Sequence, residues 1–300
     1  MRLPYVHDNA DAAGLRVLVT GASGTFGRAI AEEFVALGAH VVGLDLMPRE
    51  DDPVTVIATD ITDDASVAAG VAAALADLGG LDILVNNAGT GGPGPAEYRP
   101  DAEVARQLEL NLLGGWRVTA QCVPALVASR GRVVNVASRM AVMQLPLAAA
   151  YGVSKRAFVA WSDALRLELA PYVSVSVVYP SMVKSPIHDA TAKAGLSLEG
   201  MSVFEPLSGV VAAVVNGGLS RYPRRDIPTS RRGEVEFFVA RHFPALLDRV
   251  VERRLADRVA SGAMDNAPLA RGVVARLKGT AAPLGAAGRG HPNHVMRADP

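Results

Sequence analysis

The chain has 300 residues, half of them hydrophobic, and its 30 basic and 30 acidic side chains give zero formal net charge. This balance excludes the strongly basic composition typical of nucleic-acid-binding proteins. The single cysteine, Cys122, excludes an internal disulfide and favours a reducing compartment. No apolar run is long enough to span a bilayer, and the first residues lack the apolar core of a signal peptide. We therefore expect a cytoplasmic protein.

From residue 15 onward, short β-branched runs alternate with longer stretches of helical periodicity. Strands are predicted over residues 16–20, 40–45, 54–58, 81–85, 132–137 and 173–179. Helices are predicted over residues 25–37, 62–78, 101–128 and 150–170. Strands rich in Val, Leu and Ile that alternate with helices are typical of a parallel sheet covered on both faces. The pattern predicts an α/β fold with a doubly wound, Rossmann-type sheet in three layers, built as a single domain.

The domain is predicted to span residues 15–260, with different segments at both ends. Residues 1–14 are polar and are expected to form a flexible segment, and the Gly-, Ala-, Pro- and Arg-rich stretch 261–300 a flexible tail. Within the domain, the apolar segment 182–204 is long enough to act as a lid. Residues 221–260 form arginine-rich helices, whose apolar stripe is expected to pack on the domain or a partner, with peripheral membrane contact as the alternative.

The turn after the first predicted strand is rich in glycine and reads Thr-Gly-Ala-Ser-Gly-Thr-Phe-Gly over residues 20–27. Such glycines permit a tight turn and let backbone amides approach a pyrophosphate at the start of the following helix. The position between a strand and a helix makes this a nucleotide-binding signal. The residues predicted to contact the cofactor here are Gly21, Ser23, Gly24, Thr25, Phe26 and Gly27.

Asp45 ends the second predicted strand. A carboxylate at this place can accept hydrogen bonds from both hydroxyls of an adenosine ribose and would repel a 2′-phosphate. NAD is therefore predicted as the cofactor, with NADP less favoured, although the nearby Arg28 and Arg49 could weaken the preference. The alternative interpretation of Asp45 is a turn-forming residue before Met47 and Pro48.

Tyr151 and Lys155 lie four residues apart and would share one face of a helix. Ser138, at the end of an upstream strand, could face the same substrate oxygen. A phenol has a pKa of about 10. A cation about 4 Å away, at an effective dielectric of about 20, is worth about 4 kcal/mol. Lys155 is therefore predicted to lower the Tyr151 pKa, although desolvation opposes the shift. Taken alone, the pair also fits a surface tyrosine beside a solvated lysine.

Together with the glycine-rich turn, these three residues make the chain resemble the short-chain dehydrogenase/reductase family over roughly residues 15 to 220. Residues 60–63, Asp-Ile-Thr-Asp, look like the adenine-contacting turn of that family. Residues 86–89, Asn-Asn-Ala-Gly, look like its motif after the fourth strand, and Asn111 stands where the family has a helical asparagine.

The resemblance implies a role for each matching residue. Tyr151 would donate a proton to a carbonyl or take one from an alcohol, and Ser138 would hydrogen-bond the reacting oxygen. Lys155 would bind the nicotinamide ribose, and Asn111 would link Lys155 to solvent as a proton relay. Further cofactor contacts are implied for Asp60, Ile61, Asn87, Ala88, Gly89, Tyr151, Lys155, Val183 and Ser185. No residue is assigned as a metal ligand.

The chain departs from the family pattern at three places. Gly24 stands one position before the usual second glycine of the turn, and Ser185 stands where threonine is usual. Pro180 and Ser181 replace the usual Pro-Gly, which predicts a differently shaped turn before the substrate loop.

We expect an NAD(H)-dependent oxidoreductase acting on a secondary alcohol or ketone. The substrate is predicted to be mainly apolar, because segments 182–204, 139–147 and 90–98 should surround it. Alternatives are a non-catalytic nucleotide-sensing or scaffold protein of the same fold, and an epimerase or dehydratase using the same cofactor. The resemblance also implies a homo-oligomer, a dimer or tetramer assembled through the helices at 101–128 and 150–170.

Overall fold

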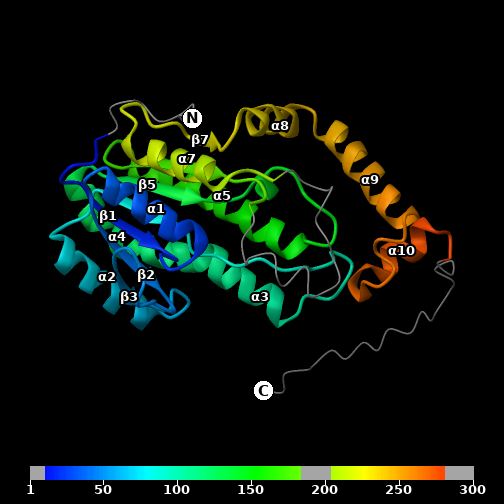
Figure 1. The fold of residues 1–300 in the computed structure, drawn as a ribbon, viewed down its shortest axis with the longest axis horizontal. Helices are drawn as coiled ribbons and strands as arrows, with labels where there is room; N and C mark the ends of the chain where they lie inside the picture. The colour runs from blue at the N-terminus through cyan, green and yellow to red at the C-terminus, as the bar shows by residue number, and fades with distance from the viewer. Residues whose placement is uncertain (1–10, 184–203, 281–300) are drawn as a thin grey trace, which may run out of the picture.

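The computed structural model describes residues 11–183 and 204–280 and has a seven-stranded parallel sheet at its centre (Figure 1). The strand order is β3-β2-β1-β4-β5-β6-β7. The strands are β1 (Arg16–Thr20), β2 (His40–Asp45), β3 (Thr55–Ala58), β4 (Ile83–Asn86), β5 (Arg132–Val136), β6 (Ser174–Tyr179) and β7 (Asp226–Pro228). Six of them confirm predicted strands. The exception, β7, lies in a stretch predicted to be helical, because three residues between arginines carry no readable strand periodicity.

Helices cover both faces of the sheet. They are α1 (Thr25–Ala36), α2 (Asp64–Leu78), α3 (Ala102–Leu108), α4 (Gly115–Ser129), α5 (Ala149–Leu169), α7 (Leu207–Leu219), α8 (Arg231–His242), α9 (Pro244–Ala260) and α10 (Arg271–Leu277). The helix predicted over 101–128 begins at the Asp101 cap, and a π-helical turn (Glu109–Gly114) joins α3 to α4. Among the described helices, none combines the length and apolarity needed to cross a membrane.

Alternate residues of the strands belong to two separate hydrophobic cores, one on each face of the sheet. Leu18 of β1 points to the face covered by α2, α4 and α5, where it joins Phe158. Its neighbours Val17 and Val19 point to the opposite face and join Phe34 of α1 in the core shared with α7. This alternation is the two-residue period of a strand. It produces the three predicted layers, and Cys122 is buried in the first core.

The order of the strands places a crevice at the end of β1. The sheet grows from β1 toward β2 on one side and toward β4 on the other. Loops that leave the carboxyl ends of β1 and β4 therefore turn to opposite faces. In open parallel sheets, ligands bind at such a switch point.

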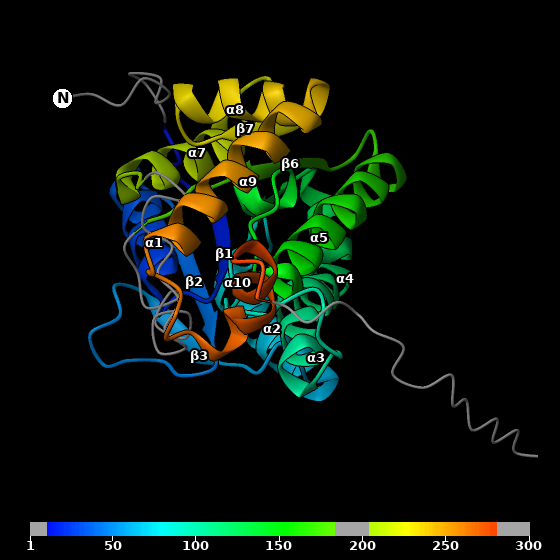
Figure 2. The same cartoon turned by 90° about the vertical axis from the view of Figure 1, so that its right-hand side faces the viewer.

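Residues 261–280, predicted as part of a flexible tail, are helical in part and packed. Met264, Ala267 and Ala270 form a small apolar cluster with Val259 of α9 and with Leu147, which lies beyond β5. The prediction of an unstructured tail is therefore wrong for residues 261–280. Sparse apolar residues among Gly and Ala hid this cluster. Figures 1 and 2 show α9 and α10 beyond one end of the sheet.

An ion pair adds to this packing at the loop after β4. Arg276 of α10 contacts Glu97 at 2.6 Å. A Cβ atom on Gly272 would lie 2.3 Å from a Glu97 carboxylate oxygen, so α10 approaches this loop closely. The C-terminal segment thus rests on two loops that leave the carboxyl edge of the sheet. Part of the apolar stripe on α9 is covered here, as the sequence predicts for packing on the domain itself.

Replacing Met264 with Asp should release residues 261–280 without unfolding the sheet. Met264 is 7% exposed, and a carboxylate in its place would be buried without a partner. We expect limited proteolysis, followed by mass spectrometry, to cut within this segment sooner than in the parent, while the thermal midpoint changes little. Leu277→Asp is the matched control, because Leu277 is 49% exposed. Equal cleavage rates in the two variants would contradict this packing.

Candidate active site

A cleft of about 510 Å³ opens at the carboxyl ends of β1, β2 and β4, beside the start of α1. Eleven of the predicted cofactor contacts line it: Gly21, Ser23, Gly24, Thr25, Phe26, Asp45, Asp60, Ile61, Asn87, Ala88 and Gly89. The cleft is also lined by five residues that were not predicted as contacts: Leu44, Leu46, Thr59, Thr90 and Leu110. Their only sequence signal is that each stands close to an assigned residue. Five separate segments of the chain therefore meet at this cleft, and four of them contain predicted cofactor contacts.

At two positions in the turn after β1, neighbouring backbone atoms lie so close that only glycine fits. Gly21 has a φ of +66°, and a Cβ on it would lie 2.9 Å from the Cα of Ala88. A Cβ on Gly27 would lie 2.0 Å from the carbonyl oxygen of Gly21. Gly27 is buried behind the turn and does not line the cleft, while Gly24 occupies the N-cap of α1. The turn is thus pressed against both its own helix and the loop after β4.

Hydrogen bonds of Thr20 and Asn87 join the turn after β1 to the loop after β4. The hydroxyl of Thr20 accepts hydrogen bonds from the amides of Asn87 and Ala88, both at 3.0 Å. The Asn87 side chain donates back to the carbonyls of Thr20 at 3.0 Å and Gly21 at 3.2 Å. These four hydrogen bonds hold the turn after β1 and the loop after β4 together at the cleft.

Two carboxylates line the far end of the cleft. Asp45 accepts hydrogen bonds from the amides of Ser23 and Met47, both at 3.0 Å. Asp45 therefore shapes the turn and also lines the cleft. Asp60 accepts from the hydroxyl and the amide of Thr62 at 2.7 and 2.8 Å, and these bonds lower the Asp60 pKa.

Ser138 and Tyr151 come together at the end of β5. Ser138 caps the short 3-10 helix Arg139–Ala141, because its Oγ accepts a hydrogen bond from the amide of Met140 at 3.1 Å. Tyr151 lies in the first turn of α5, and its phenol is hydrogen-bonded to Ser138. The structure thus brings these two side chains together. The strand-cap interpretation of Ser138 is also satisfied by the same hydroxyl.

Lys155 is buried one turn further along α5 and 4% exposed. Its Nζ donates to the carbonyl of Val136 at 3.1 Å. Burial lowers the pKa of Lys155 to about 8, because the charged amine is removed from water. The amine thus lies beneath the strand end that carries Ser138.

The predicted fall in the Tyr151 pKa is wrong for this arrangement. Burial raises the pKa of the phenol above its ordinary value, and the Ser138 hydrogen bond opposes that rise. Lys155 is not among the groups that shift it. Desolvation, weighed in the sequence analysis only as an opposing effect, is the larger one.

Asn111 lies in the π-helical turn and reaches toward the same place. Its side chain accepts a hydrogen bond from the amide of Thr90 at 2.7 Å and donates to the Thr90 carbonyl and the Ser154 hydroxyl, both at 2.9 Å. A Cβ on Gly89 would lie 3.0 Å from Asn111 Oδ1 and 3.3 Å from Lys155 Nζ. Gly89 therefore lies between the amide and the amine, and all four predicted catalytic residues belong to one neighbourhood.

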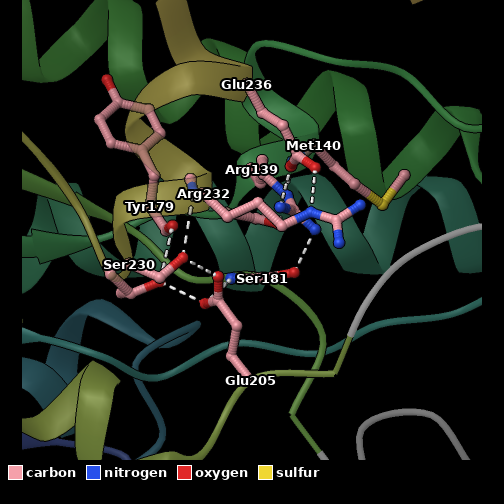
Figure 3. Close-up of polar contacts among 11 residues, drawn as sticks. Arg139, Met140, Tyr179, Ser181, Glu205, Ser230, Arg232 and Glu236 are labelled. Atoms are coloured by element: carbon pink, nitrogen blue, oxygen red, sulfur yellow. Dashed lines mark hydrogen bonds and ion pairs between the residues drawn. The ribbon is translucent and has the colours of Figure 1, made fainter.

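A buried charged residue next to Ser138 was not predicted. The Arg139 side chain is 7% exposed, and it pairs with Glu236 of α8 and hydrogen-bonds the hydroxyl of Ser181 (Figure 3). Glu205 accepts from the Ser181 amide at 3.2 Å and from the hydroxyl of Ser230. Ser181, the residue that replaces the usual glycine, was the one sequence signal of this network.

Among the described residues, four predicted cofactor contacts do not line the cleft: Gly27, Tyr151, Lys155 and Val183. Val183 is 5% exposed and follows Met182, which forms an isolated bridge with Phe204. Ser185 lies outside the described residues, as does most of the predicted lid.

With the geometry established, comparisons with known proteins identify the family. The model for "short chain dehydrogenase" matches residues 16–195. The chain belongs to the short-chain dehydrogenase family. Relatives in this family are named dehydrogenases and reductases, which places the protein in a family of oxidoreductases.

Three matches illustrate the similarity. A 3-ketodihydrosphingosine reductase from Bacteroides thetaiotaomicron is 34% identical over 167 residues, which is 55% of this chain but only 62% of the relative. Nodulation protein G from Rhizobium sp. (strain N33) is 32% identical over 232 residues, 69% of this chain and 94% of the relative. The structure of 3-ketoacyl-(acyl-carrier-protein) reductase from Brucella melitensis, complexed with NADH, has a TM-score of 0.64 and 28% identity over 74% of this chain and 99% of its own.

Replacing Lys155 with Met should change how stability depends on pH. Between the folded pKa of about 8 and the ordinary value of 10.5, the unfolded state binds more protons, so this amine makes stability rise with pH. Below pH 8 the buried charge of Lys155 lowers the free energy of unfolding by up to about 3 kcal/mol. We expect the variant to be more stable than the parent at pH 7, with the difference shrinking toward pH 10.5.

Urea denaturation at several values from pH 7 to 10.5 measures this difference. Lys278→Met, at a partly exposed lysine of the C-terminal segment, is the control and should follow the parent curve. If the free energy of unfolding depends on pH in the same way in the Lys155 variant and in the parent, the pKa of Lys155 is not lowered in the folded protein.

Proposed function

We propose that this protein is an NAD(H)-dependent oxidoreductase that transfers a hydride between the nicotinamide and a secondary alcohol or ketone on a mainly apolar substrate, with Tyr151 as the general acid and base. The observation that carries the proposal is the hydrogen-bonded pair of Ser138 and Tyr151 beside the buried Lys155. These groups end at the same edge of the sheet as the cleft. This common edge supports a single site for the cofactor and the chemistry.

The residues present fit a dinucleotide. The amides of the turn between Gly21 and Gly27 would hold the pyrophosphate, because the turn opens directly into the N-terminus of α1. Asp45 would hold the adenosine ribose, and Gly89 gives space for the second ribose near Lys155. The bound dinucleotide would supply or accept the hydride.

The chain's own residues then handle the proton. Burial keeps the Tyr151 phenol protonated at neutral pH, which suits a proton donor to a carbonyl oxygen. In the reverse direction, the Ser138 hydrogen bond favours the phenolate, because it lowers the pKa of the phenol. Lys155, with a pKa of about 8, is mostly charged at neutral pH and would orient a ribose hydroxyl. Asn111 fixes the backbone of Thr90 next to that amine.

The preference for NAD(H) is supported by the charge at the ribose end. Asp45 lines the cleft with its carboxylate, which would repel a 2′-phosphate. The similar Brucella reductase has NADH bound in its structure.

The substrate proposal is supported by the apolar character of the segments around Tyr151. Ala141, Leu145 and Leu147 are buried in the loop that leads into α5. Leu147 also contacts the C-terminal cluster, which brings residues 255–274 to the substrate side. The name of the Bacteroides relative, a 3-ketodihydrosphingosine reductase, supports a ketone as the reacting group.

Replacing Tyr151 with Phe should abolish turnover and leave nucleotide binding nearly intact. Loss of a general acid or base typically lowers the rate about 10²- to 10⁴-fold. The measurement is absorbance of the reduced nicotinamide during a screen of cyclic alcohols, hydroxysteroids and the matching ketones, with NADH affinity from calorimetry. Tyr172→Phe, at an exposed tyrosine after α5, is the control and should turn over like the parent. Turnover at the parent rate in the Tyr151 variant would overturn the assignment.

The proposed homo-oligomer is supported by apolar side chains on the outer faces of α4 and α5. Trp116 is 49% exposed, Val153 56% and Leu167 80%. Large apolar side chains that gather on exposed helix faces are typical of subunit interfaces.

Replacing Leu167 with Glu should therefore dissociate the oligomer, because a carboxylate would be buried at the interface. Light scattering after size exclusion measures the mass at micromolar concentration. Val235→Glu on α8, 63% exposed, is the matched control and should keep the parent mass. A parent protein that is already monomeric would contradict the proposed assembly.

A further inference from the structure

The loop after β2 folds back on the glycine-rich turn and is held there by Asp52. The Asp52 side chain is only 3% exposed. It accepts hydrogen bonds from the hydroxyl of Ser23 at 2.5 Å, from the amide of Arg49 at 2.7 Å and from the guanidinium of Arg28 at 2.9 Å. One carboxylate thus joins the turn, the first helix and its own loop.

Ser23 connects this carboxylate to the predicted ribose-binding residue. Its backbone amide donates to Asp45 at 3.0 Å, while its hydroxyl donates to Asp52. The two carboxylates therefore contact the same residue of the turn. A change of charge at Asp52 would therefore alter the electrostatic potential where the adenosine ribose is expected.

Two cations line this end of the cleft, and they differ in their partners. Arg28 pairs with Asp52 and also contacts Asp51, through the carbonyl at 2.7 Å and the carboxylate at 3.2 Å. The guanidinium of Arg49 makes no ion pair with any residue that the structure describes, although it lines the cleft. Arg28 is therefore the cation whose charge is already compensated.

Asp52 keeps its charge in this position. Burial alone raises the pKa of Asp52, but the hydrogen bonds from Ser23 and Arg49, together with the Arg28 cation, outweigh burial and hold that pKa below its ordinary value. The ion pair with Arg28 is consequently intact throughout the neutral range.

We propose that Asp52 is a specificity-determining residue for the nucleotide: by holding Arg28 in an ion pair, it keeps the guanidinium from binding a 2′-phosphate and so favours NAD(H) over NADP(H). This inference rests on the proposed function. Asp45 acts by repelling the phosphate directly, whereas Asp52 acts by occupying the cation that would attract it. An arginine near the ribose is the usual partner of a 2′-phosphate.

Calorimetric titration with NADH and with NADPH tests this without knowledge of the substrate. In Asp52→Asn, the amide oxygen can still accept from Ser23, but the charge that compensates Arg28 is lost. NADPH should then bind roughly two- to fivefold more tightly than to the parent, the range of a partly exposed ion pair. NADH affinity should change less than about twofold by the same measure, since NADH has no 2′-phosphate. The gain should shrink in high salt.

Asp51→Asn is the matched control, because the Asp51 carboxylate touches the same guanidinium but its side chain is 78% exposed. It should leave the NADPH to NADH ratio near that of the parent. Adding Arg28→Leu to Asp52→Asn should remove the gain in NADPH affinity. In the parent background, Arg28→Leu alone should leave the ratio unchanged, which tests the proposal even if the Asp52 variant does not fold.

Two results would overturn the inference while leaving the proposed function standing. One is tight NADH binding with the same NADPH to NADH ratio in the parent and in Asp52→Asn. The other is a several-fold loss of NADPH affinity in Arg28→Leu alone, which would mean that Arg28 already binds the phosphate. A parent protein that binds neither nucleotide would overturn the proposed function and this inference together.

Discussion

The close approach of Gly21 to Ala88 is the constraint on which the rest of the site depends. A side chain at residue 21 would push the turn after β1 away from the loop after β4. With the two loops in contact, the Thr20 hydroxyl can accept both amides of the Asn87–Ala88 peptide segment. The same loop continues to Gly89, whose missing side chain leaves room for Lys155 and Asn111. A contact between two backbones thus relates the nucleotide end of the cleft to the catalytic end.

Charge is distributed unevenly along this cleft. Asp45 and Asp60 lie at the end where the adenosine is expected, and both accept hydrogen bonds from the turns that they shape. Lys155 lies at the other end in an environment that lowers its pKa and offers it one carbonyl acceptor. Structural needs explain the carboxylates, since turns require acceptors. They do not explain a buried amine, because an apolar side chain of similar length would pack there without a desolvation cost. That contrast is a physical argument for function at Lys155.

The parts of this molecule that could be predicted from sequence are those encoded locally. β-branched runs gave six strands, and a glycine turn between a strand and a helix gave most of the cleft, because strand order places such turns at one edge. Structural features that depend on contacts between distant residues were not predicted. The strand β7 acquires its conformation from pairing with β6, and the packing of Met264 depends on Leu147, over a hundred positions away. The sign of the Tyr151 pKa shift was wrong for the same reason, since burial is set by the whole fold.

The connection between β5 and α5 (residues 137–148) is held by segments that lie beyond the region matching the family model, which ends at residue 195. Arg139, next to Ser138, forms an ion pair with Glu236 of α8. Leu147, just before α5, packs in the C-terminal apolar cluster. The nucleotide half of the site, in contrast, lies entirely within the matched region. The region shared with relatives therefore contains the whole cleft, whereas the positions of Arg139 and Leu147 also depend on this chain's own later sequence. Differences in substrate among members of the family are expected to arise from such segments, since fold and cofactor site are shared.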